Sequence, residues 1–311
     1  MGFFSWLSGN KGGGGGKEAE KGAPRGGSRI SNADVNNALK QLDGSPESIA
    51  EARRVVGATQ LSNAERAEAY RRINASVSYR NQRDNGDDGD VMCNMTSMAM
   101  AMNGLGLGTD ESKNGQYENV LDKKRAGRGL SRYQEDDRES LAEGYGLDAV
   151  TLKTPGFADG DSAKNWYFEN VFPRMAAGAT ATFGVQGGNG SGGTFRHVIR
   201  LEWVEDKGLR IDDPFGGGLQ ADDKGTVGYA KLNEQKGQGG VGENGLMTWD
   251  QVAKMNKNKY VQLYATKGGP KGKAPSGAAA KAPAAPKAPA AAPSAPAPAA
   301  KPSRRARGGR P

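Results

Sequence analysis

The sequence predicts an α+β protein in which helices come first and antiparallel strands follow. Two observations predict this class. Amphipathic segments with helix-capping residues follow one another from residue 34 to about 144. From residue 180, short runs rich in β-branched and aromatic residues are separated by glycine clusters. Because helices and strands are grouped and do not alternate, the strands are expected to pair antiparallel.

Composition limits the foldable part of the chain to about residues 31–266. Residues 1–30 contain a run of five glycines, and residues 267–311 are rich in Lys, Ala and Pro, with ten of the fifteen prolines. Neither segment can bury enough apolar surface to offset its chain entropy, so both are expected to be disordered. Within the foldable part we expect a helical preface over 31–74 and a second segment over 75–266 that carries the strands.

The net charge of +8 is concentrated in the C-terminal segment. Residues 267–311 hold ten Lys or Arg and no acidic residue, whereas residues 1–266 hold 33 basic and 35 acidic residues, a net charge of −2. Such a tail is either a soluble spacer or a means of holding an anionic surface or a secretion partner by charge. It has no aromatic residue to stack on bases, so no specific nucleic acid is expected as a partner.

Three helices are expected in the preface, and further helices after it. The first three are 34–42, 46–57 with Ser45 as cap and Pro46 in the first turn, and 63–74 after the capping box Ser62-x-x-Glu65. Their charged faces indicate either a simple helical preface or a partner-binding bundle. Later helices are expected at 94–104, at 132–144 after the box Ser131-x-x-Gln134, and within WYFENVFPRMAAG (166–178), which follows a loop around 155–165.

Strands are expected at 180–185, 197–205, 208–214 and 259–265, where β-branched and aromatic residues gather. A helix that starts from the box Thr248-x-x-Gln251 precedes the last of these strands.

Cys93 is the only cysteine of the chain, so no internal disulfide can form and nothing favours an oxidising compartment. It lies at the predicted start of the helix 94–104, where the helix dipole lowers a thiol pKa. A lone cysteine is commonly an inert core residue. The apolar residues after it are expected to pack in the core because they recur at helical spacing: Met95, Met98, Met102 and Leu105.

Three further residues complete a candidate catalytic set. His197 is the only histidine and opens a strand, and Asp213 lies 16 residues later in IDDPFG, one strand hairpin away. Cysteine chemistry needs an imidazole as base, and the imidazole needs a third group to hold its ring. Asp212 competes with Asp213, but alternation along a strand points the two to opposite faces. Gln82 is the candidate oxyanion donor beside the Cys93 N–H, with Gln186 as an alternative amide.

These residues and their motifs resemble the papain-like cysteine peptidases of the double-glycine leader family, which process bacteriocins and peptide toxins. The resemblance lies in Gln82 of NQRDN, Cys93 of CNMTSMAMAMNGLG, His197 of FRHVIRLEWVE and Asp213 before Pro214, and it covers about residues 75–266. It implies a papain-like α+β fold with Cys93 as nucleophile, His197 as base, Asp213 as orienting group and Gln82 as oxyanion donor. Family members usually have glycine after the cysteine, where this chain has Asn94, and a shorter gap between glutamine and cysteine.

The resemblance implies hydrolysis of a peptide bond, with small residues such as Gly-Gly before the scissile bond. The chain itself carries Gly-Gly at 26–27, 187–188, 192–193, 239–240 and 268–269, which raises the hypothesis of self-processing. Two other functions stay open. A cell-wall peptide amidase would use the same Cys-His chemistry, and a binding module without catalysis would use the cleft or the basic tail.

No cofactor or metal site is predicted. Cys93 and His197 lie too far apart in sequence for zinc spacing, and in DNGDDGD (84–90) Gly86 occupies the third ligand position of a calcium loop counted from Asp84. The glycine clusters match no nucleotide-binding motif.

The expected location is the cytoplasm of the producer, with export into a target cell that needs no cleaved signal. The apolar run FFSWL is too short for a secretory signal, and no stretch reaches the ~20 apolar residues of a membrane span. A peptidase without exporter domains and with disordered ends is typical of an antibacterial effector toxin. Its expected partners are a protein or peptide substrate, an immunity protein that inhibits it and a secretion apparatus.

Overall fold

The computed structural model describes residues 29–85, 89, 91–108, 116–188, 194–215, 220–221, 227–228 and 242–267, all of which belong to one compact unit. Nearly all of the arm 1–30 and of the tail 267–311 lies outside these residues, as do positions 86–88 and 90 of the acidic run. The Gly-Gly pairs at 26–27, 192–193, 239–240 and 268–269 also lie outside them.

The α+β arrangement that the sequence predicts is confirmed. The helices are α1 (Ala33–Lys40), α2 (Pro46–Ala58), α3 (Asn63–Ala75), η1 (Gln82–Asp84), α4 (Cys93–Asn103), α5 (Tyr117–Gly127), α6 (Glu135–Glu143), α7 (Gly160–Asn170), α8 (Phe172–Ala176) and α9 (Trp249–Met255). The strands are β1 (Leu147–Lys153), β2 (Thr180–Gly188), β3 (Thr194–Glu205), β4 (Gly208–Asp212), β5 (Gln220–Ala221), β6 (Val227–Gly228), β7 (Gly245–Thr248) and β8 (Tyr260–Thr266).

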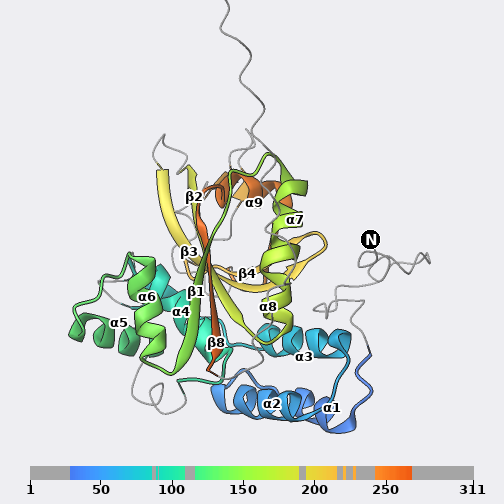
Figure 1. Ribbon diagram of the computed structural model, residues 1–311. Helices are drawn as coiled ribbons and strands as arrows, with labels where there is room; N and C mark the ends of the chain where they lie inside the picture. The colour runs from blue at the N-terminus through green and yellow to red at the C-terminus, as the bar shows by residue number, and fades with distance from the viewer. Residues whose placement is uncertain are drawn as a thin grey trace, which may run out of the picture. The chain divides into compact units, whose positions relative to one another are not determined.

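The sheet is antiparallel along its main path, which runs β1-β8-β2-β3-β4-β7 (Figure 1). The last strand, β8, lies between β1 and β2, so the end of the described chain is paired on both sides within the sheet. The two-residue strands β5 and β6 pair with each other, and β6 meets the end of β2 at Gly188↔Gly228.

Helices lie on both sides of the sheet, with α4, α5 and α6 on one side and α7 and α8 on the other (Figure 1). Side-chain alternation on β2 explains this arrangement. Ala181, Phe183 and Val185 are buried in one core with α7, α8 and α9. Thr182 points to the other face, where its hydroxyl lies 3.3 Å from the Tyr264 hydroxyl. Tyr264 belongs to a second core that includes Met95, Met98 and Met102 of α4, so the methionines expected to be core residues are buried.

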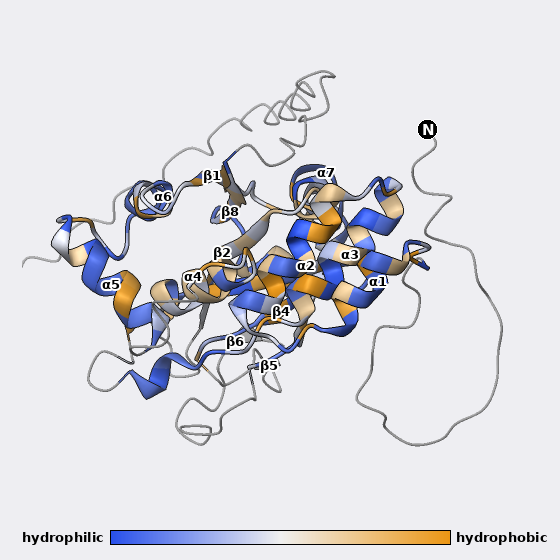
Figure 2. Ribbon diagram, turned by 90° about the horizontal axis from the view of Figure 1, so that it is seen from below, coloured by the Kyte–Doolittle hydropathy of each residue, from blue (hydrophilic) through white to orange (hydrophobic). Residues whose placement is uncertain are grey.

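The helices α1–α3 share the first core with the sheet, because buried residues of all three belong to it. Figure 2 shows that hydrophobic and hydrophilic residues alternate along these three helices. Two arginines add polar links: the Arg53 Nη1 of α2 donates to the Gly178 carbonyl at 2.8 Å, and the Arg200 Nη2 of β3 donates to the Asn74 carbonyl of α3 at 2.6 Å. The preface is therefore packed against the sheet that carries His197.

Local capping signals predicted several helix starts correctly. Both residues of the box Ser62-x-x-Glu65 bond as expected at the start of α3, and so do those of Thr248-x-x-Gln251 at the start of α9. The helix start predicted from the box Ser131-x-x-Gln134 is wrong, because α6 begins only at Glu135 and Gln134 is its N-cap residue. The Ser131 hydroxyl instead accepts the Tyr133 N–H at 3.1 Å, which forms a local turn.

Other predicted boundaries are corrected by the structure. The loop expected around 155–165 already contains the start of α7, because Asp159 forms a capping box with Ser162. The single helix expected in 166–178 is split into α7 and α8, with Val171 between them. The sequence patterns do not predict the helices η1 and α5 or the strands β1, β5, β6 and β7. In the part of the chain that the structure describes, no helix has the length and hydropathy needed to cross a membrane.

Candidate active site

Cys93 is the first residue of α4, and this helix is fastened to an edge of β3. The ladder between β3 and β4 reaches only to Arg200↔Asp212, so Val198 lies beyond it. Both backbone groups of Val198 bond to α4 instead. Its N–H donates to the Cys93 sulfur, and its carbonyl accepts the Ser97 hydroxyl at 3.0 Å. Because Cys93 and Ser97 are one helical turn apart, the two bonds set the helix start against the strand that carries His197.

His197 joins Cys93 to Asp213. Its Nε2 lies 2.8 Å from Asp213 Oδ1, and a side-chain hydrogen bond connects the imidazole to the Cys93 thiol. With Nε2 held by the carboxylate, Nδ1 is the ring nitrogen that faces the thiol. The structure therefore brings together three residues that are separated by 104 and 16 positions in the sequence. The order nucleophile, base, orienting group is the one that acyl transfer requires.

Asp213 is held by its backbone as well as by its carboxylate. Its N–H donates to the Gly242 carbonyl at 2.8 Å, and its carbonyl accepts the Tyr79 hydroxyl at 2.7 Å. A Cβ on Gly242 would lie 2.1 Å from the backbone carbonyl oxygen of Asp213, so only glycine allows the two segments to approach this closely. Asp213 Oδ1 also accepts the Phe215 N–H at 2.9 Å. The orienting carboxylate is fully buried and is fixed in position before any substrate binds.

The electrostatics of this trio favour a thiolate beside an imidazolium. Burial opposes ionisation of the Cys93 thiol, but the His197 charge and the N–H groups of Val198 and Asn94 outweigh it, so the thiol pKa is lowered. Burial also opposes the imidazolium, but the Asp213 carboxylate and the Cys93 thiolate outweigh it and raise the pKa of His197 to about 10. The pKa of the half-buried Cys93 thiol therefore lies below its ordinary value, which is the condition that a nucleophilic cysteine requires.

Phe215 covers the imidazole from one side. Its ring stands edge-on to the His197 ring at 6.1 Å between centroids, and the Arg83 guanidinium lies 4.6 Å from the Phe215 ring centre. These two contacts hold the Phe215 ring between the imidazole and the Arg83 side chain.

Gln82 is buried in η1 and lies close to the trio in the fold. Its N–H donates to the carbonyl of Pro214, the residue after Asp213, at 2.8 Å. Its side-chain Nε2 donates to the Gly89 carbonyl at 2.6 Å, in the segment that leads to Cys93. An amide nitrogen carries two hydrogens, so the oxyanion role predicted for Gln82 would use the second one. That role stays a prediction.

The two competing residues have other partners. Asp212 points away from the imidazole, as strand alternation predicts, and its carboxylate forms a buried ion pair with Arg200. Gln186 accepts a hydrogen bond from the ammonium of Lys259. Neither contact involves Cys93 or His197.

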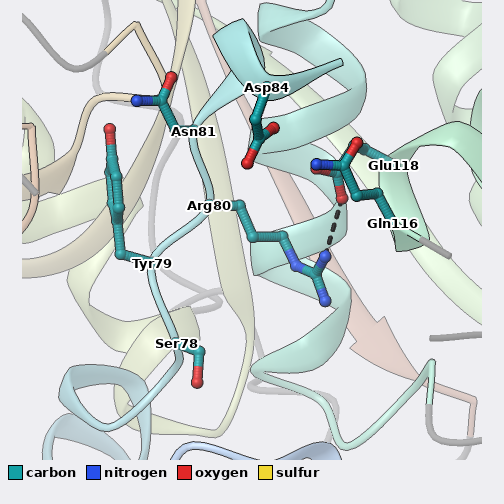
Figure 3. A pocket seen from close by; sticks show the side chains of 7 residues that line it. All are labelled: Ser78, Tyr79, Arg80, Asn81, Asp84, Gln116 and Glu118. Atoms are coloured by element: carbon teal, nitrogen blue, oxygen red, sulfur yellow. Dashed lines mark hydrogen bonds and ion pairs between the residues drawn. The ribbon is translucent and has the colours of Figure 1, made fainter. Parts of the chain in front are cut away.

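A cavity of about 370 Å³, lined by residues with polar side chains, lies beside the segment that leads into η1 (Figure 3). The Arg80 guanidinium crosses it to pair with the buried Glu118 at 2.8 Å. The lining residues come from this segment and from the start of α5: Ser78, Tyr79, Arg80, Asn81, Asp84, Gln116 and Glu118. Because none of the trio lines this cavity, it does not mark the position of a substrate's reacting bond.

Sequence reasoning missed Tyr79, Gly242, Phe215 and Ser97. Ser97 carried a usable signal, since it lies four residues after Cys93 on the same helix face. Tyr79 bonds to a residue 134 positions away, and no local pattern indicates that contact. Among the described residues, no group of three or more His, Cys, Asp or Glu side chains is arranged to hold a metal ion.

Comparison with protein-family models, with curated proteins and with solved structures finds no match to this chain.

Proposed function

We propose that the chain is a papain-like cysteine peptidase that hydrolyses a peptide bond through a thioester. The observation that carries this proposal is the bonded series Cys93, His197 and Asp213, in which the thiol pKa is lowered and the pKa of His197 is raised to about 10. A cysteine that only packs in a core does not need a buried imidazole beside it that is itself held by a buried carboxylate.

In the proposed reaction the Cys93 thiolate attacks the carbonyl carbon of the scissile bond, which gives a tetrahedral oxyanion. The Cys93 N–H, at the start of α4, and the Gln82 amide stabilise that oxygen. His197 then gives its proton to the departing amine as the C–N bond breaks and the thioester forms. A water molecule loses a proton to His197 and attacks the thioester, which releases the acid and restores the thiolate.

The proposed family is that of the double-glycine leader peptidases, of which this chain would be a stand-alone member. The motif residues support it, as does the geometry, in which a helix that begins at the nucleophile packs on an antiparallel sheet that carries the base. In that family the substrate has Gly-Gly, or similar small residues, before the scissile bond. The proposed biological role is that of an antibacterial effector that acts on proteins of a target cell and is inhibited by a cognate immunity protein.

The test compares the wild-type chain with Cys93→Ala in a bacterial host, with growth and newly formed protein N-termini as readouts. The proposal expects growth inhibition and new termini for the wild type alone. Circular dichroism of both proteins checks that the variant is folded. Equal growth without new termini would contradict the effector role, and release of peptides from purified sacculi without protein cleavage would establish the amidase instead. Identical behaviour of both chains in every assay would leave a binding module.

A further inference from the structure

Asn94, the residue after the nucleophile, turns its side chain away from the reacting centre. The side chain is buried, and its Nδ2 donates to the carbonyl of Arg132 in the turn between α5 and α6. Its Oδ1 accepts the Met95 N–H at 3.1 Å. The amide that replaces the family's glycine therefore ties the start of α4 to the α5–α6 turn, which glycine cannot do.

The α5–α6 turn, residues 130–134, is held by several other bonds. The Arg132 guanidinium binds both oxygens of Asp122, at 2.9 and 2.7 Å. The Arg132 carbonyl also accepts from Arg138 at 3.3 Å. The Ser131 N–H donates to the Asp137 carboxylate at 2.7 Å. A turn with this many side-chain bonds is rigid compared with an ordinary surface loop.

This rigid turn presents a large aromatic side chain to solvent. Tyr133 is 67% exposed, more than any other large hydrophobic residue that the structure describes. Val91, two residues before Cys93, is 36% exposed. A bare tyrosine on a fixed backbone loses little entropy on binding, which is why such residues act as anchors in recognition surfaces. Tyr133 directly follows Arg132, whose carbonyl binds the side chain of Asn94, the residue after Cys93.

We propose that Tyr133 is a specificity-determining residue that contacts an apolar side chain of the peptide substrate near the scissile bond. Asn94 is then a positioning residue, because it holds the turn that presents Tyr133 against the start of α4. This inference rests on the proposed peptidase activity. The occupant is an apolar side chain because two exposed residues near the nucleophile along the bonded chain are themselves large and hydrophobic: Val91, two residues before Cys93, and Tyr133, next to the Arg132 that binds Asn94. Contact with an apolar side chain displaces water from both surfaces.

The test is a library of decapeptides in which one position at a time around the cleavage site is Leu, Phe or Ser. The wild type is expected to cleave peptides with Leu or Phe at one such position about tenfold faster, as kcat/KM, than the serine peptide. Tyr133→Ser is expected to lose this preference through a higher KM, and Tyr133→Phe to keep it. Asn94→Gly is expected to weaken the preference, because the Arg132 carbonyl loses the donor that holds the turn against the start of α4.

Two controls make the outcomes separable. Leu246→Ser removes an exposed apolar side chain from β7, at the opposite edge of the sheet from β1, and should keep the wild-type preference. Alkylation of Cys93 by iodoacetamide reports the thiolate without any peptide contact, so it should be equal in Tyr133→Ser and wild type. If peptides are cleaved and Tyr133→Ser keeps the preference, this inference is overturned and the peptidase proposal stands. If the wild type cleaves no peptide, both are overturned.

Discussion

Replacing Asp213 with asparagine removes one charge from the candidate active site and leaves its shape unchanged. The same oxygen, Oδ1, lies 2.8 Å from His197 Nε2 and accepts the Phe215 N–H at 2.9 Å. The Oδ1 of an asparagine can keep both contacts. The substitution therefore isolates the effect of the negative charge on the imidazole, which is the first of the attractive effects that raise the pKa of His197.

The expected magnitude follows from the distance. A carboxylate within hydrogen-bond range of an ionisable group shifts its pKa by about 1–3 units, or about 1.4–4 kcal/mol in favour of the charged form. The pKa of His197 is about 10 in the wild type, so it should fall to between about 7 and 9 in Asp213→Asn. Because His197 is the only histidine, its imidazole signal in an NMR titration belongs to this site alone.

Asp212→Asn is the matched control for this prediction. It removes a neighbouring buried carboxylate that pairs with Arg200 and accepts the Asn244 N–H at 3.0 Å. We expect the control to destabilise the fold by about 3–5 kcal/mol, because Arg200 is left buried without its partner charge. In Asp212→Asn the pKa of His197 should stay near its wild-type value. An unchanged His197 titration in Asp213→Asn, or an equal shift in both variants, would refute the charge argument.

Three further predictions concern the surroundings of the trio. Ser97→Ala should lower the free energy of unfolding by about 1–3 kcal/mol, measured by denaturant titration, because the Val198 carbonyl loses its donor; an unchanged midpoint would contradict this. Phe215→Ala should lower the free energy of unfolding by about 1–2 kcal/mol, measured by denaturant titration, because the ring contacts with the His197 ring and the Arg83 guanidinium are lost, and Phe215→Tyr should not. The stability of the wild type should fall between pH 9.0 and about 10. Above its ordinary pKa of 9.0 the thiol has lost its proton in the unfolded chain as well, so only the folded chain still holds a proton, on His197. That proton is lost as the pH rises through the His197 pKa of about 10, and the stability that it provides is lost with it. The His197→Gln variant should lack this fall, and thermal unfolding across that range would show an equal fall in both if the reasoning is wrong.

Much of the framework could be predicted because its signals are local. The capping boxes at Ser62 and Thr248 mark the starts of α3 and α9, and the apolar spacing after Cys93 marks α4. Strand alternation also correctly separates Asp213, which directly follows β4 and faces His197, from Asp212, which ends β4 and faces Arg200. Each of these inferences needs only a few neighbouring residues and a fixed period.

Other features could not be predicted because they depend on distant partners. Strand β1 pairs with β8, more than a hundred residues later, and its own sequence LDAVTLK gives only a weak pattern. The bonds of Asp213 to Tyr79 and Gly242, and of Asn94 to Arg132, exist only after the sheet and the helices have come together. At Ser131 the capping-box pattern was misleading, because the Ser131 hydroxyl accepts the N–H of Tyr133 within the turn and does not cap a helix.

The central claim is that Cys93 is a thiolate paired with the His197 imidazolium at neutral pH. The most direct measurement is the pH dependence of Cys93 alkylation by iodoacetamide, which reports one thiol because the chain has no other cysteine. We predict rapid alkylation of Cys93 well below the ordinary thiol pKa of ~8.5, with slower alkylation in His197→Gln. A thiol that titrates near ~8.5 in the wild type, unaffected by loss of His197, would contradict the account.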